Sequence, residues 1–491
     1  MEQHALLSAV LAMLLASRAE AQGRTVCFIT NYAQYRPCNA WQPRQLNATL
    51  CTHVHFAFAF LNADSSIMLR EYNDFRFRFS QAVATSASRA RFINSTMAWL
   101  DRFGFDGIDI DWEYPGDLNR GGSTQDKRNL GLFFAEFRAE QRRRGKRYLL
   151  AMSTAAGAAG RVGLDMPIMI RTLDYISIMT YDFHGAWESR VNHLAPWKDP
   201  QGGTLDIVTT LDFYIRTAKW PKSKLNLGLA AYGRSWQLVS AACTTLPSLP
   251  SPLGSLAKGP GPAAECTGEG GSLAWFEIKR MIATGRMKVA IDRTAKAAYL
   301  QTPAGAWISF DLPETLWMKA VAARQMGLGG LMVWTADLDD SGSTMLKVAK
   351  YGQNPGSYLQ YLPRPKAPPP LQRPAKTGAV AAAAAAACAA ACGSGAAVAA
   401  AIAQSAAGLY CGGGAVGIGA CRASALCCSQ WGHCGTAPLF CSLDAGCLGG
   451  PCRSYAGTRY GQPPPANGTS MTDSTAVYEQ MSALKAALGG R

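Results

Sequence analysis

The sequence lacks an apolar run of the length that crosses a bilayer. Residues 5–16 are apolar but too few, and the alanine-dominated stretch 379–407 has low average apolarity and is interrupted by Gly393-Ser394-Gly395. We therefore predict a low-complexity linker in 379–407 rather than a membrane span. The apolar run 5–16 precedes Ala19-Glu20-Ala21, a small-x-small cleavage pattern, so we expect residues 1–21 to be a secretory signal peptide and the protein to be secreted.

Acidic residues are scarce relative to basic ones. The chain has 33 Asp and Glu against 48 Lys and Arg, which gives a formal net charge of +15. Such a charge can indicate a nucleic acid or an anionic surface as partner. Here the basic residues are scattered, and the short cluster 142–147 falls at an expected helix end. We therefore expect no nucleic-acid partner and no membrane partner.

What the sequence does contain is an unusual strand-like stretch, Phe105–Pro115. Its alternation sends Asp109, Asp111 and Glu113 to one face and the apolar residues between them to the other. Carboxylates roughly 6–7 Å apart on a buried strand cannot all ionise near neutral pH, so they must share protons or meet a ligand. Glu113 stands last, at the open end of the strand, and is the candidate general acid, with the other two tuning and orienting it.

Two other interpretations of this acid row are weaker. A solvated acidic turn does not explain why isoleucines and a tryptophan interleave the acids. A magnesium or calcium site usually lies on a loop, and the stretch lacks the Asp-x-Asp-x-Asp-Gly pattern. We expect neither a metal nor a cofactor.

The run Asp-x-x-Asp-x-Asp-x-Glu that ends at Glu113, with its flanking Trp and Tyr-Pro, resembles the signature of family 18 glycoside hydrolases, the chitinases. The resemblance implies an α/β fold, a (β/α)8 barrel, in which Glu113 protonates the glycosidic oxygen. The substrate's own N-acetyl carbonyl replaces the second carboxylate of an ordinary retaining enzyme. Asp111 would hold that acetamido group, and Asp109 would hold Asp111.

Later stretches resemble other elements of the same family. The strand-like run Tyr175–Asp182 resembles a Met-x-Tyr-Asp element, in which Tyr181 would hydrogen-bond the reacting carbonyl. The substrate-binding residues that the resemblance implies are Tyr32, Met179, Asp182, Trp187, Tyr232, Arg234 and Trp334. Considered alone, Met179 would be core packing, whereas Trp334 follows Gly-Gly and fits an aromatic floor for a sugar ring. His184 is expected to be structural.

One barrel strand is not found. Apolar runs of the parallel-strand type occur at 25–31 and 53–60, but 62–88 has no sustained apolar run, and only Phe75–Phe79 alternates as a strand does. The family carries its third strand at this point. Either the segment has been lost or a makeshift replacement stands in its place, and a missing parallel strand leaves two unpaired edges.

The barrel is expected over residues 22–352, with a small α+β insertion at about 236–305. Cys243 and Cys266 are a plausible pair within the insertion, and pairing of Cys27 with Cys51 would join the first two strands. Beyond the barrel we expect three further segments: a Pro-rich then Ala-rich linker at 353–408, a small disulfide-rich domain at 409–453 and a low-complexity tail at 454–491.

Eight of the 15 cysteines fall between residues 411 and 452, a density typical of a small disulfide-built domain. The run 427–435, Cys-Cys-Ser-Gln-Trp-Gly-His-Cys-Gly, resembles the hevein-type chitin-binding domain. A zinc site is the weaker alternative in a secreted protein. The resemblance implies the pairs Cys411–Cys428, Cys421–Cys434, Cys427–Cys441 and Cys447–Cys452. It also implies sugar-binding positions at Ser429, Trp431, His433 and Phe440, where His433 and Phe440 depart from the family pattern.

Together the two modules predict a secreted, monomeric chitinase that hydrolyses β-1,4-linked N-acetylglucosamine polymers with retention. Its partners would be chitin and chito-oligosaccharides. The alternative from another class is a chitin-binding lectin whose barrel no longer turns over, which the missing strand favours and the presence of Glu113 opposes. A lysozyme-like activity on peptidoglycan is weaker still.

Overall fold

The computed structural model describes residues 23–68, 78–239 and 253–353, together with four two-residue strands between 413 and 435. The expected signal peptide, linker, tail and almost all of the cysteine-rich module lie outside these residues. Of that module, β16 (Gly413–Gly414) pairs with β17 (Gly417–Ile418), and β18 (Cys427–Cys428) pairs with β19 (Cys434–Gly435). In the described part of the chain, no helix combines the length and the apolarity needed to cross a bilayer.

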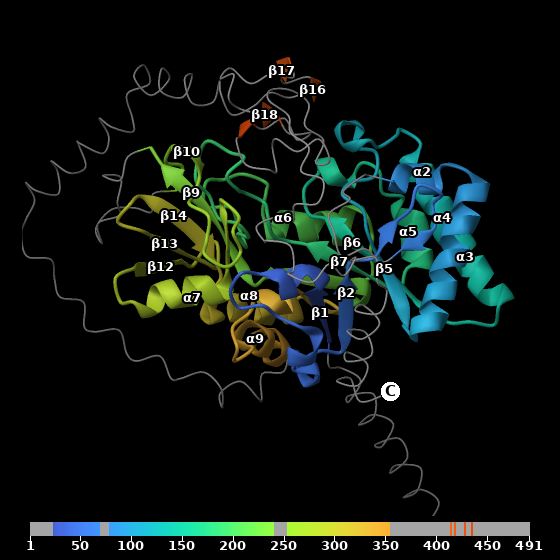
Figure 1. Ribbon diagram of the computed structural model, residues 1–491, viewed down its shortest axis with the longest axis horizontal. Coiled ribbons are helices and arrows are strands. Elements are labelled where there is room, and N and C mark those ends of the chain that lie inside the picture. Colours follow the sequence, from blue (N-terminus) through green and yellow to red (C-terminus); the bar gives the residue numbers. More distant parts are fainter. Residues whose placement is uncertain are drawn as a thin grey trace, which may run out of the picture.

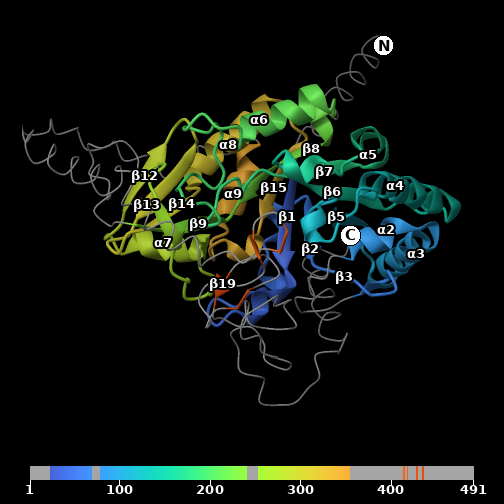
Figure 2. The same ribbon diagram turned by 90° about the horizontal axis from the view of Figure 1, so that it is seen from above.

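Parallel strands form the central sheet, in the order β2-β1-β15-β8-β7-β6-β5 (Figure 1, Figure 2). Their bounds are β1 Arg24–Thr30, β2 His53–Ala57, β5 Gly107–Asp111, β6 Leu149–Ala155, β7 Tyr175–Met179, β8 Leu225–Ala230 and β15 Gly330–Trp334. Alternate residues divide between an inner and an outer apolar cluster: Val26 and Phe28 of β1 lie in the inner one, Cys27 and Ile29 in the outer. Burial on both faces explains why these strands read as continuous apolar runs.

Helices cover the outer face of this sheet (Figure 2). They are α2 Phe79–Ala84, α3 Ser86–Phe103, α4 Asp126–Arg143, α5 Met166–Thr172, α6 Ile207–Asp212, α8 Pro313–Gln325 and α9 Thr344–Gly352. Local sequence fixes the ends of α3: Thr85 and Ser88 form a reciprocal capping box, and Gly104 ends the helix with φ +67°. Single-turn helices are η1 Asn31–Tyr35, η2 Pro43–Gln45, η3 Ala48–Leu50, η4 Leu118–Arg120, η5 Ala159–Arg161, η6 Phe213–Thr217, η7 Lys222–Lys224 and η9 Ala336–Leu338.

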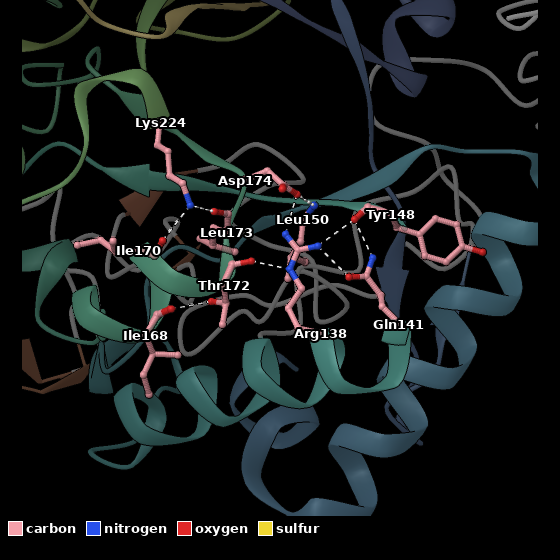
Figure 3. Close-up of polar contacts among 10 residues, drawn as sticks. All are labelled: Arg138, Gln141, Tyr148, Leu150, Ile168, Ile170, Thr172, Leu173, Asp174 and Lys224. Carbon is pink, nitrogen blue, oxygen red and sulfur yellow. Dashed lines mark hydrogen bonds and ion pairs between the residues drawn. The ribbon is translucent and has the colours of Figure 1, made fainter. Parts of the chain in front are cut away.

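A polar network on α4 fixes the helical layer against the beginnings of the strands (Figure 3). Arg138 donates to the carbonyl of Thr172 at 2.6 Å, to Oδ2 of Asp174 at 2.7 Å and to the carbonyl of Tyr148 at 3.1 Å. Lys224 donates to the carbonyls at the end of α5 and just beyond it. These bonds satisfy carbonyls that a helix end would otherwise leave unpaired.

The sheet is open between β2 and β5. In the described residues neither strand has a partner on its outer side, although both views show them side by side (Figure 1, Figure 2). Between them the chain forms a hairpin of β3 (Phe60–Leu61) and β4 (Ile67–Met68), which pairs only with itself. The expected α/β barrel of parallel strands is therefore present, with seven strands in the described residues instead of eight.

The strand-like alternation of Phe75–Phe79 does not extend to its last residue. Phe79 begins helix α2, and its ring stacks on Trp112 with centroids 5.5 Å apart. An aromatic alternation fits a strand only where a neighbouring strand pairs with it, and here Phe79 instead covers the outer face of β5.

A second, antiparallel sheet forms the insertion and lies with helix α7 (Trp275–Ala283) at the end of the molecule opposite α2–α5 (Figure 1). Its order is β10-β9-β14-β13-β12, with β11 also paired to β9. The bounds are β9 Tyr232–Leu238, β10 Ala257–Pro260, β11 Ser272–Ala274, β12 Lys288–Asp292, β13 Ala297–Gln301 and β14 Ala306–Phe310.

Two disulfides occur in the described residues. The predicted bond between Cys27 and Cys51 is present, with Cα atoms 5.9 Å apart, and it joins β1 to the start of β2. The predicted pairing of Cys243 with Cys266 is wrong, because Cys266 is bonded to Cys38. The reason is topological: β1 pairs with β15, so the chain after β1 passes the insertion, where Cys38 packs against the apolar cluster of Cys266 and Phe276.

Candidate active site

The acid row occupies the last part of β5 and the turn that follows it. The predicted alternation is present: Ile110 and Trp112 are 2% and 3% exposed in the outer core. On the other face the side chain of Asp109 is 8% exposed, and that of Glu113, beyond the end of the strand, is 42% exposed. The row therefore runs from the interior of the barrel to its mouth.

The environment raises the pKa of every acid in the row. Burial raises the pKa of Asp109 to about 7, although two hydrogen bonds from Ser153 oppose the rise. Burial, followed by the charges of Glu113 and Asp109, raises the pKa of Asp111 well above its ordinary value. The pKa of Glu113 rises because of desolvation; Arg120 opposes this rise and Asp182 adds to it. The row thus retains protons at a pH where isolated carboxyls would have lost them.

Three groups from other strands face Asp109. Its Oδ1 accepts hydrogen bonds from the backbone N–H and the hydroxyl of Ser153, both at 2.9 Å. Its Oδ2 faces Nδ1 of His55 at 3.4 Å, and Nε2 of the same ring lies 3.0 Å from the hydroxyl of Tyr175. By contrast, Oδ1 of Asp111 is buried and has no hydrogen-bond partner within the described residues.

A second polar cluster lies where β7 and β8 end. Arg234 binds Asp182 through two hydrogen bonds of 2.8 and 2.7 Å, and its guanidinium lies 5.5 Å from the ring centre of Trp187 and 5.4 Å from that of Tyr232. The ring of Tyr232 meets that of Tyr181 edge to face at 6.0 Å. The charges of Asp111, Asp182 and Glu113 all act on Tyr181 and add to the rise in its pKa that burial causes, so this cluster borders the acid row.

The remaining sequence-predicted residues line the interior and the rim. Trp334 ends β15 and contacts the rings of Phe28 and Phe58, with centroids 5.3 and 5.7 Å away. Met179 packs against the same inner cluster, which is the core role its pattern alone predicts. Tyr32 and Trp187 are 42% and 45% exposed, so their rings are accessible at the mouth.

His184 is a structural histidine, as expected. It is buried, and its Nδ1 lies 2.9 Å from a carboxylate oxygen of Glu188 while its Nε2 lies 3.2 Å from Asn192. Within the described residues no group of three or more His, Cys, Asp or Glu side chains could hold a metal ion.

Comparison with known proteins assigns the chain to a family. The sequence profile "Glycosyl hydrolases family 18" matches residues 71–339, which is more than half of the 491 residues. The chain belongs to glycosyl hydrolases family 18.

Its relatives in this family include chitinases by name. Chitotriosidase-1 of Mus musculus is 32% identical over 358 residues, covering 65% of this chain and 73% of that protein. The probable chitinase 10 of Drosophila melanogaster is 29% identical over 360 residues, 65% of this chain but 15% of that much longer protein.

Solved structures share the family 18 fold. Catalytic domain 2 of the Group II chitinase of Ostrinia furnacalis superposes with a TM-score of 0.62 at 28% identity, over 68% of this chain and 96% of that one. Human YKL-39, a pseudo-chitinase with retained chitooligosaccharide binding, has the same fold at 22% identity, with a TM-score of 0.59 over 67% of this chain and 99% of that one.

Several residues that border the family 18 acid row escaped the sequence analysis. Ser153 and His55 are polar side chains in strands that are largely apolar, β6 and β2, and this was the one signal that the sequence offered for them. Arg120 carried none, because it lies on η4, a loop helix anchored from α4: Asp126 accepts hydrogen bonds from the backbone N–H groups of Gly116 and Ser123 at 3.0 and 2.7 Å. Loop residues are placed by such tertiary anchors, which no local pattern reveals.

Proposed function

We propose that the protein is a chitinase that hydrolyses β-1,4 linkages of N-acetylglucosamine polymers with net retention. The observation that carries this proposal is the row Asp109, Asp111 and Glu113, whose pKa values are all raised and whose last member lies at the mouth of the barrel. A carboxyl that stays protonated and accessible near neutral pH is what a general acid requires.

In the proposed reaction, Glu113 donates its proton to the glycosidic oxygen as the bond from C1 to that oxygen breaks. The carbonyl oxygen of the substrate's acetamido group attacks C1 and forms a cyclic intermediate. Water then attacks C1, Glu113 takes a proton from it, and the ring opens with the original configuration restored. Asp111 accepts a hydrogen bond from the acetamido N–H, and the hydroxyl of Tyr181 donates one to the acetamido carbonyl.

The other residues of the site would bind the sugar chain. Trp334 provides the floor on which a pyranose ring stacks, and Tyr32 and Trp187 provide exposed rings at the rim. Asp182, Arg234 and Tyr232 form a polar wall, and Met179 supports it from the inner core.

A chitin-binding lectin is the second candidate function, and the open edge between β2 and β5 favours it, because a loosened barrel mouth can retain binding while losing the alignment that catalysis needs. The two are separated by assaying a soluble chito-oligosaccharide with the wild type and Glu113→Gln, and by measuring binding of the same oligomer calorimetrically. Turnover by the wild type alone supports hydrolysis. Binding by both proteins with turnover by neither supports the lectin, and no binding by either contradicts both.

We further propose that the protein is secreted and monomeric and that its C-terminal module is a hevein-type domain that attaches the enzyme to insoluble chitin. The two disulfides of the described residues agree with an oxidising compartment. Attachment raises the local concentration of substrate without changing the chemistry. Trp431→Ala in the full chain should reduce retention on chitin powder and leave turnover of a soluble oligomer unchanged; equal retention would contradict the proposal.

A further inference from the structure

His55 and Asp109 face each other across the open edge of the sheet. His55 lies on β2 and Asp109 on β5, the two outer strands, and Nδ1 of the histidine is 3.4 Å from Oδ2 of the carboxylate. Their side chains are 14% and 8% exposed. The contact lies inside the barrel, where side chains from strands that do not pair also meet, as His55 of β2 and Tyr175 of β7 do.

The surroundings of His55 define its hydrogen-bonding options. Its ring meets Phe28 of β1 edge to face at 4.7 Å, which leaves its two nitrogens for Asp109 of β5 and Tyr175 of β7. The other titratable or charged groups near it are His53 on its own strand and Arg24 of β1, whose guanidinium lies over the Tyr175 ring at 4.8 Å.

Burial keeps the imidazole neutral. It lowers the pKa of His55 to about 4 and raises that of Asp109 to about 7. A neutral imidazole has one N–H, so two arrangements exist. In one, Nδ1–H donates to Asp109, which is ionised, and the Tyr175 hydroxyl donates to Nε2. In the other, Asp109 is protonated and donates to Nδ1, and Nε2–H donates to Tyr175.

Ser153 favours the first arrangement. Oδ1 of Asp109 already accepts two hydrogen bonds from it, and each such bond stabilises the ionised carboxylate. Oδ2 of Asp109 and Nδ1 of His55, which face each other, have no hydrogen-bond partner among the described residues. The 3.4 Å separation is slightly long for a hydrogen bond, and contacts of this kind commonly shorten when substrate binds.

We propose that His55 is a positioning residue for the acid row: its Nδ1–H binds Asp109 across the open edge and keeps it ionised, so that the proton retained by the row lies on Asp111 and Glu113. The catalytic consequence rests on the proposed function, whereas the placement of the proton does not. Without the N–H of His55, Asp109 would take up a proton itself, and its charge would no longer raise the pKa of Asp111.

The protonation of Asp109 tests this proposal without any turnover. Its carboxyl band can be followed by infrared spectroscopy against pH and assigned with Asp109→Asn. His55→Asn places an amide where Nδ1 lies, His55→Gln places one where Nε2 lies, and His55→Leu removes both. We expect the Asp109 midpoint to stay in place in His55→Asn and to rise by about one pH unit or more in His55→Gln and His55→Leu, the size expected for one lost bond to a carboxylate.

His53→Asn is the matched control on the same strand and should leave the Asp109 midpoint unchanged. Equal midpoints in His55→Asn and His55→Gln would overturn the proposal. Should the variants not fold, the wild type still decides: nitrogen NMR of ¹⁵N-histidine-labelled protein must show His55 protonated at Nδ1, and protonation at Nε2 refutes it.

If the wild type turns over chito-oligosaccharide, the basic limb of its kcat profile should move to lower pH in His55→Gln and His55→Leu but not in His55→Asn. A purely structural histidine would lower activity or stability without moving that limb. If there is no turnover, the chitinase proposal fails while the infrared and NMR measurements still decide the role of His55.

Discussion

Nη1 of Arg120 lies 3.8 Å from Oε2 of Glu113 and donates a 3.1 Å hydrogen bond to the backbone carbonyl of the same residue. The guanidinium also lies 5.4 Å from the ring centre of Tyr114. A cation therefore stands beside the acid that we propose as proton donor. Since the positive charge favours the ionised carboxylate, Arg120 acts against the desolvation that keeps Glu113 protonated.

Arg120→Gln should raise the pKa of Glu113 by removing this opposing charge. A general acid works in its protonated form, so activity is lost as the pH rises through its pKa, and the basic limb of kcat/KM should move to higher pH. We expect a shift below about one unit, because both side chains are partly exposed and solvent screens the pair. Lys127→Gln, which removes an exposed cation from α4, is the control; a limb that moves equally in both variants would contradict the prediction.

Asp182→Asn should shift the same limb in the opposite direction. The Asp182 charge raises the pKa of Glu113, so neutralising it should lower that pKa and move the basic limb to lower pH. The variant also weakens the pair of hydrogen bonds that Arg234 donates to residue 182, so we expect a higher KM for chito-oligosaccharides. Measuring pH profiles of kcat and KM separately distinguishes the two effects, and a basic limb that moves upward would count against the assignment of Glu113 as the acid.

Local sequence predicted the acid row because its geometry is local. The alternation of β5 sets Asp109 and Asp111 on one face and Ile110 on the other, whatever the strand packs against. The anchoring of the row could not be predicted in this way. His55 reaches Asp109 because the closure of the barrel brings the inner faces of β2 and β5 together, and Arg120 reaches Glu113 through a loop fixed by Asp126.

In the fold, too, local sequence predicts some features, and tertiary structure alone determines others. Apolar runs identified the parallel strands, since burial on both faces leaves a clear compositional trace. Cys38 and Cys266 left no such trace: they are 228 residues apart, and the pairing of β1 with β15 brings them together. Cys243 was predicted as the partner of Cys266 because the two are close in sequence, whereas the tertiary fold places Cys38 beside Cys266.

Loss of the Cys38–Cys266 bond should destabilise the barrel. The bond closes a loop of 228 residues, and removal of a native disulfide typically costs about 2–5 kcal/mol. Cys38→Ser with Cys266→Ser should therefore lower the denaturant midpoint of unfolding. Mass spectrometry of unreduced peptides provides the direct check: one crosslinked peptide must contain both cysteines, and a crosslink from Cys266 to any other cysteine would refute the pairing.

The pair Lys319 and Asp311 offers a test of packing away from the site. Nζ of Lys319 lies 2.8 and 2.7 Å from the two carboxylate oxygens, and both side chains are 1% exposed. Lys319→Met leaves a buried carboxylate without its partner, so the free energy of unfolding should fall by about 3–5 kcal/mol, measured by urea denaturation. Adding Asp311→Leu should recover most of the loss, because the double variant buries no unpaired charge. Arg216→Met, which breaks an exposed pair with Asp212, should cost less than about 1 kcal/mol; equal costs for Lys319→Met and Arg216→Met would contradict the buried ion pair.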